Sequence, residues 1–269
     1  MKKIAVVNDI SGFGRCSLTA ALPVISSFGL QCCPLVTGVY SNQTGYDSYK
    51  NVDLTDSLHS FIDEWKKLGA HFDAIITGFV TSAKQGEIIA NFIDDFRDGA
   101  LVVVDPVMAD DGEVYDGFDK ERINSVISLA KKADIITPNL HELCIIAGRE
   151  FSENLTDSDI CDMSKSSGVD TVITTGIKRD DKVLTAVYHG DEFETVAQQK
   201  LGGSFSGTGD ILASYVTAAI VSGDNVFTAV KKACSFIEQA IRLTLAENGE
   251  TPYRAEGVYF EKLLGFNPE

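Results

Sequence analysis

The stretch Leu101-Val102-Val103-Val104-Asp105-Pro106 is the most direct sequence indication of the fold. Its four consecutive apolar residues are typical of a strand that is covered on both faces, as in the centre of a parallel sheet. Asp105 and Pro106 then end the run, because the residue before a proline is displaced from helical geometry. The stretch therefore predicts a central parallel strand that ends in a carboxylate.

Similar apolar runs alternate with longer segments of helical period along the rest of the chain. The other expected parallel strands are Ile4–Val7, Cys32–Thr37, Ala74–Thr77, Asp134–Thr137 and Thr171–Thr174. The expected helices are Ser17–Phe28, Leu54–Leu68, Ala83–Phe96, Asp119–Lys132, Leu140–Ala147, Asp210–Val221 and Val226–Glu247. A turn between Val183–Tyr188 and Phe193–Ala197 predicts a hairpin. This order predicts an α/β fold with a doubly wound, mostly parallel central sheet and helices on both faces.

The bulk composition limits the classes of partner and the compartment. The formal net charge of −16 argues against nucleic acid and anionic membranes as partners. No cysteine pair has zinc-binding spacing, so the six cysteines are expected to be reduced and mostly buried. The apolar run at the N-terminus is too short for a signal peptide, and no run is long enough to cross a membrane. A cytoplasmic protein with one domain over residues 1–269 is expected.

Small, polar or acidic residues follow every predicted parallel strand. They include Asn8–Gly14, Val39–Tyr46, Gly78–Ser82, Asp105–Gly112, Thr137–Glu142 and Thr175–Gly176. Any one of these segments could be a turn or a helix cap, and Asn139 and Glu142 have the spacing of a capping box. Ligands in doubly wound folds bind beyond the carboxyl ends of the strands. The whole set therefore indicates a binding edge.

The segment Gly207-Thr208-Gly209-Asp210 opens a predicted helix. Unpartnered N–H groups at a helix N-terminus, together with the helix dipole, form a site for an anion. A carboxylate there could take a proton from a hydroxyl next to a bound phosphoryl group. The alternative is an ordinary helix start with a first-turn acid. The third glycine of a dinucleotide-binding fingerprint is absent and no P-loop occurs, which argues against dehydrogenases and ordinary P-loop kinases.

These motifs, in this order over nearly the whole chain, resemble the ribokinase-like superfamily and, within it, the pyridoxal/pyridoxamine kinase and hydroxymethylpyrimidine kinase branch. The segments that carry the resemblance are Asp9–Gly14, Ser41–Tyr46, Thr77–Phe79, Asp105–Met108, Thr137–Glu142 and Gly207–Asp210. The resemblance implies a ribokinase-like fold, a homodimer, and phosphorylation of a vitamin hydroxymethyl group by ATP with Mg²⁺.

The resemblance also implies a role for each motif. Asp210 corresponds to the catalytic base, with Gly207, Thr208 and Gly209 as the anion hole. Asp105 and Glu142 correspond to the residues that position Mg²⁺. The residues that it places near ATP are Asp105, Asp110, Tyr115, Asn139, Glu142, Thr175 and Thr208. The residues that it places around the substrate ring are Asp9, Ser11, Thr44 and Phe79. The loop from Met108 to Asp116 resembles a lid.

Two departures leave the substrate open. Many pyridoxal kinases carry histidine where Gln43 stands and tyrosine where Phe79 stands, and some hydroxymethylpyrimidine kinases carry cysteine where Asp210 stands. The preferred interpretation is a vitamin B6 kinase, with hydroxymethylpyrimidine (phosphate) kinase as the alternative. A non-catalytic protein that binds nucleotide or pyridoxal phosphate, and a sugar kinase, are the other classes considered. The apolar residues Phe13, Val39, Phe79 and Val107 suit an aromatic ring better than a polyol.

Overall fold

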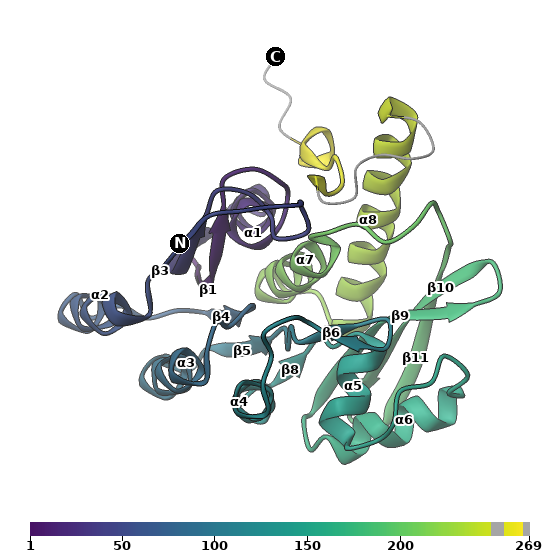
Figure 1. Ribbon diagram of the computed structural model, residues 1–269, viewed down its shortest axis with the longest axis horizontal. Coiled ribbons are helices and arrows are strands. Elements are labelled where there is room, and N and C mark those ends of the chain that lie inside the picture. The colour runs from purple at the N-terminus through teal and green to yellow at the C-terminus, as the bar shows by residue number, and fades with distance from the viewer. Residues whose placement is uncertain (249–255, 266–269) are drawn as a thin grey trace.

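The computed structural model describes residues 1–248 and 256–265. Within these ranges a nine-stranded sheet has the order β11-β10-β9-β8-β5-β4-β1-β2-β3 (Figure 1). Its strands are β1 (Lys3–Ser11), β2 (Gln31–Tyr40), β3 (Asn51–Asp53), β4 (Ala74–Thr77), β5 (Leu101–Val104), β8 (Ile135–Ile136), β9 (Thr171–Arg179), β10 (Lys182–His189) and β11 (Glu192–Gln199). The strands from β2 to β9 in this order pair in parallel, whereas β3, β10 and β11 pair antiparallel with their neighbours.

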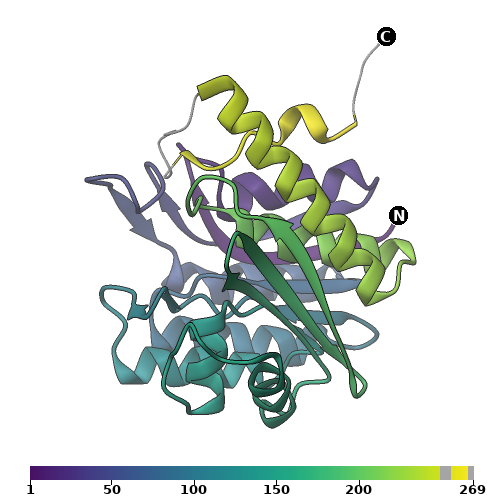
Figure 2. The same cartoon turned by 90° about the vertical axis from the view of Figure 1, so that its right-hand side faces the viewer.

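Helices cover both faces of the sheet (Figure 1). One face carries α1 (Ser17–Ser27), α7 (Thr208–Ser222) and α8 (Val226–Asn248). The opposite face carries α2 (Thr55–Lys67), α3 (Ala83–Phe96), α4 (Lys120–Ala130), α5 (Leu140–Ala147) and α6 (Asp157–Ser166). In Figure 2, α8 crosses in front of the long strands at the β11 end of the sheet, and the short 3-10 turn Glu261–Leu263 lies beyond it.

Alternating side chains of β1 supply both halves of the core. Ile4 and Val6 pack with the α1, α7 and α8 side, whereas Ala5 and Val7 pack with the α2 and α3 side. All four are buried. This arrangement follows from the two-residue repeat of a strand, which sends successive side chains to opposite faces. It explains why continuous apolar runs mark the central strands.

The predicted fold class is confirmed, and the elements differ from expectation at the strand ends. β1 continues beyond Val7 to Ser11, because Ser11 still pairs with Tyr40 of β2 after a register shift. β9 likewise runs past Thr175 and Gly176 to Arg179. The predicted hairpin is present as β10 and β11.

Three short strands were not predicted. β3 is an edge strand whose residues are all exposed, so it has no burial pattern. β6 (Ala109–Asp110) and β7 (Glu113–Val114) form a separate two-stranded hairpin inside the predicted lid loop. None of the helices in the described ranges is long and apolar enough to span a bilayer.

Candidate active site

The site is built where the N-termini of α1 and α7 meet the carboxyl end of β1. Gly207, the residue that precedes α7, has φ 80°, and a Cβ added there would lie 1.8 Å from the carbonyl oxygen of Arg15. Only glycine therefore fits this position. The Ile211 N–H donates to the Gly207 carbonyl at 3.0 Å. The N–H groups of Thr208, Gly209 and Asp210 precede that bond and are the free donors of the helix start.

Asp210 lies in the first turn of α7 and is half-buried. Asn8 Nδ2 donates to its Oδ1 at 3.1 Å. Burial raises the pKa of Asp210 to about 6, with a further contribution from the charge of Asp9, while the Ser17 N–H and Asn8 oppose that rise. The carboxyl is thus held by fixed donors, with a pKa close enough to neutrality for proton transfer.

Asp105 and Glu142 are two further buried carboxyls at the same edge. Burial raises the pKa of Asp105, and the charge of Asp210 raises it further, although Thr137 Oγ1 donates to it at 2.9 Å. Burial and then Asp105 raise the pKa of Glu142. A Cβ added at Gly209 would lie 3.6 Å from Asp105 Oδ2, which places Asp105 against the first turn of α7. Three acidic groups therefore repel one another in one confined space.

Glu142 is also a structural residue. Its carboxylate accepts from the N–H of Asn139 at 2.8 Å and from the N–H of Met108 at 3.0 Å. The Asn139 side chain accepts from the Glu142 N–H at 2.9 Å, so the capping box is present. Asn139 Nδ2 donates to the carbonyl of Ala109 at 2.6 Å, and the backbone of Asn139 forms an isolated parallel β-bridge with Thr175. These predicted ATP-side residues therefore lie together and hold the start of the lid loop.

The donor set fits Mg²⁺, which prefers oxygen ligands and keeps several waters. Asp105, Glu142 and Asp210 form no ion pair with lysine or arginine in the described part of the chain. Their mutual repulsion is therefore left for a cation to relieve. No group of three or more metal-binding side chains is found among the residues described. A Mg²⁺ ion here would thus be held by the carboxylates of Asp105 and Glu142, with water as its remaining ligands.

The predicted substrate residues divide into two groups. Asp9 and Ser11 are buried, and Ser11 Oγ donates to Asp9 at 3.3 Å. The half-buried Phe79 is tied to the same place, because its N–H donates to Asn8 Oδ1 at 3.2 Å. Thr44, by contrast, is exposed in the loop after β2. The structure thus brings Asp9, Ser11 and Phe79 close to Asp210 and leaves Thr44 at the surface.

The predicted lid residues lie in and after the β6–β7 hairpin. Asp110 and Tyr115 are both exposed. The Tyr115 N–H donates to the Met108 carbonyl at 3.0 Å, which closes the loop on itself. Although Tyr115 as a whole is 41% exposed, partial burial of its phenol raises its pKa, and the charges of Glu142, Asp110, Asp105 and Asp210 add to the rise. The phenol therefore lies within the field of these carboxyls.

Asn8 and Ser17 contact Asp210, but neither was assigned a role from the sequence. Ser17 Oγ donates to Asp9 at 2.8 Å while its N–H supports Asp210. Asn8 approaches so closely that a Cβ at Gly78 would lie 2.5 Å from its Nδ2. A polar residue that directly follows a buried apolar run was the available signal for Asn8. Nothing in the sequence distinguishes Ser17 from a helix cap.

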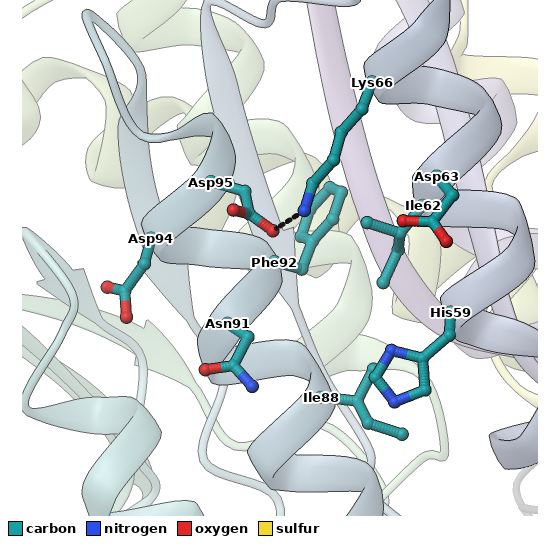
Figure 3. A pocket seen from close by; sticks show the side chains of 9 residues that line it. All are labelled: His59, Ile62, Asp63, Lys66, Ile88, Asn91, Phe92, Asp94 and Asp95. Atoms are coloured by element: carbon teal, nitrogen blue, oxygen red, sulfur yellow. Dashed lines mark ion pairs between the residues drawn. The ribbon is translucent and has the colours of Figure 1, made fainter.

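Two hollows differ in their relation to this site. One of about 10 Å³, the size of a single water, is lined by apolar residues of the core together with Asn8, Thr77, Asp105 and Asp210. The Thr77 hydroxyl there is buried without a partner. The other, of about 360 Å³, lies on the outer surface between α2 and α3, where Lys66 pairs with Asp95 at 2.6 Å (Figure 3). None of the predicted site residues lines it.

The sequence model of the phosphomethylpyrimidine kinases matches residues 14–253. The chain belongs to this family. A Bacteroides thetaiotaomicron protein, solved in a crystal form with pyridoxal, is 39% identical, with a TM-score of 0.91 over 98% of this chain and 94% of its own. A pyridoxal kinase from Leifsonia xyli is 26% identical over 94% of this chain and 92% of its own length.

The fold is also that of more distant pyridoxal kinases. The enzyme from Leishmania donovani, in complex with ADP and pyridoxamine, is 20% identical and has a TM-score of 0.85 over 98% of this chain and 96% of its own. Together with the family match over residues 14–253 and a pyridoxal kinase structure from Lactobacillus plantarum that is 26% identical with a TM-score of 0.90 over 98% of this chain and 95% of its own, this shows a kinase family member with the ribokinase-like fold.

Proposed function

We propose that this kinase transfers the γ-phosphoryl group of ATP to the hydroxymethyl group of a B6 vitamer, giving the 5′-phosphate and ADP. Pyridoxal, pyridoxamine and pyridoxine are the candidate acceptors. The observation that carries the proposal is the placement of Asp210. It combines a half-buried carboxyl of raised pKa with the free N–H groups of a helix start.

Asp210 is the proposed base. It accepts the hydroxymethyl proton while the oxygen attacks the γ-phosphorus, and the bond from that phosphorus to the β-phosphate bridging oxygen breaks. The N–H groups of Gly207, Thr208 and Gly209 are proposed to hold the transferring phosphoryl group, whose negative charge they match. The Asn8 amide fixes the carboxylate so that its free oxygen keeps one orientation.

Asp105 and Glu142 are proposed to hold Mg²⁺, which neutralises phosphate charge when it is bound. The neighbours of these carboxyls support the assignment. Thr137 orients Asp105 by a buried hydrogen bond, and Glu142 is fixed by backbone N–H groups. Asp110, Tyr115, Asn139 and Thr175 are proposed to lie along ATP.

The proposal of a B6 vitamer as substrate rests on Phe79, the aromatic residue of the proposed acceptor wall, and on the relatives of the chain. The Phe79 backbone is hydrogen-bonded to Asn8, which also contacts Asp210, and an aromatic side chain at this position suits a flat aromatic substrate. Asp9 and Ser11 are the proposed polar contacts of the ring, with Thr44 reaching it only if the exposed loop after β2 folds over. One relative of the chain is named a pyridoxal kinase and another was crystallised with pyridoxal.

Hydroxymethylpyrimidine (phosphate) kinase is the second candidate, favoured by the name of the matching family. Phe79 lacks the hydroxyl that a tyrosine would offer to a ring substituent. A homodimer and a cytoplasmic location stay predictions.

Initial rates with Mg·ATP test the two candidates directly. Pyridoxal, pyridoxamine, pyridoxine and hydroxymethylpyrimidine are compared at equal concentration, with Asp210→Asn as the inactive control. We expect the highest kcat/KM with one of the three B6 vitamers. A higher value with hydroxymethylpyrimidine would transfer the assignment to the second candidate. ATP consumption unaffected by any of the four would contradict both.

A further inference from the structure

Arg122 is a buried guanidinium that lies between two phenylalanine rings. It stands in the first turn of α4 and is 8% exposed. Its Cζ lies 3.5 Å from the ring centroid of Phe118 and 4.9 Å from that of Phe79. Both distances are within the range of cation–π attraction. The two rings belong to different parts of the site, because Phe79 follows β4 and Phe118 follows the lid loop.

The hydrogen bonds of Arg122 join the same two segments. Nε donates to the carbonyl of Val80 at 2.7 Å, and Nη1 donates to the carbonyl of Gly117 at 3.4 Å. Each acceptor is the chain neighbour of one of the two rings. The rigid fork of a guanidinium can hold two carbonyls and two ring faces at once, which a lysine ammonium cannot do.

The charge of Arg122 is not neutralised by an ion pair in the described ranges. Its Nη2 is buried without a hydrogen-bond partner. Burying a cation in this way costs free energy unless its surroundings compensate. For core packing alone, an apolar side chain would fill the space without that cost. The guanidinium is therefore explained best by what it connects.

Contacts continue from both phenylalanines into the site, through the ring and backbone of Phe118 and through the backbone of Phe79. Phe118 meets the ring of Tyr115 at 6.3 Å, and its N–H donates to the Tyr115 carbonyl at 3.1 Å. On the other side the Phe79 N–H donates to Asn8 Oδ1, and Asn8 Nδ2 donates to Asp210. Arg122 thus lies between the lid residue proposed to cover ATP and the wall proposed to hold the acceptor.

We propose that Arg122 is a positioning residue that couples the lid to the acceptor wall, so that ATP and the acceptor each strengthen the binding of the other. The inference rests on the proposed function. Movement of the lid over ATP would pull Phe118 and Gly117, and Arg122 would transmit that displacement to Phe79 and Val80. Because coupling between two sites is reciprocal, the same factor must be found from either ligand.

Isothermal titration calorimetry measures this factor. The Kd of a non-hydrolysable ATP analogue with Mg²⁺ is determined with and without saturating pyridoxal, and the ratio is the coupling factor. For the unmodified protein we expect roughly 5-fold or more, the lower end of ordinary allosteric coupling. Arg122→Met, which keeps apolar volume and removes the fork, should bring the ratio to about 1. Arg97→Met, at an exposed arginine on the end of α3, is the matched control and should leave the ratio unchanged.

The outcomes separate three cases. A merely structural role of Arg122 would lower Tm or weaken both ligands while the ratio stays at its original value, which would overturn the inference. A ratio of 1 in the unmodified protein, with both ligands bound, would also overturn it and leave the proposed function standing. Failure of either ligand to bind the unmodified protein would contradict the proposed function instead. If Arg122→Met does not fold, Phe118→Leu cuts the same link at the lid and must also reduce the ratio.

Discussion

Asp210 should be indispensable for turnover but not for nucleotide binding. Asparagine at this position keeps the shape and the Asn8 contact but cannot accept the acceptor proton, so Asp210→Asn should lower kcat by about 10²- to 10⁴-fold. Calorimetry should still detect the ATP analogue. Asp170→Asn, at an exposed acid, serves as the control. Near-normal turnover by Asp210→Asn would remove the base assignment.

The same substitution should make the protein more stable. The pKa of Asp210 is about 6 in the folded protein and near 4 in the unfolded chain. The protonated carboxyl therefore contributes its full stability below pH 4, and this contribution is lost as the pH rises through 6. Asp210→Asn removes the cost of the charge and should raise the free energy of unfolding by about 3 kcal/mol at pH 7.5. Urea unfolding at pH 7.5 and pH 4 checks this, and an equal difference at both values would contradict it.

Asn8 should affect the rate more than the affinity. Its Nδ2 donates to Asp210, and its Oδ1 accepts from the N–H groups of Asp9 and Phe79. Asn8→Ala frees the Asp210 carboxylate to rotate, and we expect kcat to fall about tenfold or more, since misplaced catalytic groups lose orientation. Asn91→Ala, on the outer surface of α3 (Figure 3), is the control. A change in KM alone would contradict the orienting role.

The start of α7 depends on one glycine. Gly207→Ala would combine a left-handed φ with a Cβ placed 1.8 Å from the Arg15 carbonyl, so the loop or the helix must move. Gly148, at the end of α5, has φ 65° with nothing within 4 Å of an added Cβ. In urea unfolding, Gly148→Ala should cost about 1 kcal/mol, and Gly207→Ala should cost clearly more and abolish turnover. Equal costs would show that the close contact is easily relieved.

Burial explains which elements were predictable from the sequence. The central strands and their helices carry long apolar patterns, because both faces of the sheet are covered. β3 is fully exposed and β6 and β7 have two residues each, so none has a pattern to detect. The extension of β1 to Ser11 depends on pairing with Tyr40 of β2, and Asn8 gains its partner Phe79 only in the folded chain.

The residues of the candidate site could be predicted from sequence motifs, but the contacts between them could not. Asp105, Glu142 and Asp210 stand at strand or helix ends, where composition already marks a binding edge. Arg122 was not identified, because an arginine in a helix start is ordinary until its neighbours are known. Whether an arginine is buried, and between which rings, is decided by tertiary packing alone.

At the scale of the whole molecule, Mg²⁺ should stabilise the protein even without nucleotide. The chain carries a net charge of −16, and its buried carboxyls repel one another at one edge of the sheet. A site occupied at ten times its Kd adds about 1.4 kcal/mol, or roughly 3 °C in Tm. NaCl at matched ionic strength measures general screening, and Asp105→Asn should lose the excess seen with Mg²⁺. An equal shift with both salts would argue against a specific site.

The bond between Asn8 and Asp210 joins residues 202 positions apart in the chain. During synthesis Asn8 leaves the ribosome long before its partner in α7. Long-range contacts of this kind form late, because the intervening chain must be ordered first. A nascent chain that stops before α7 would contain every strand of the large sheet yet lack the proposed base. Competence for phosphoryl transfer would therefore arise only once α7 has been synthesised.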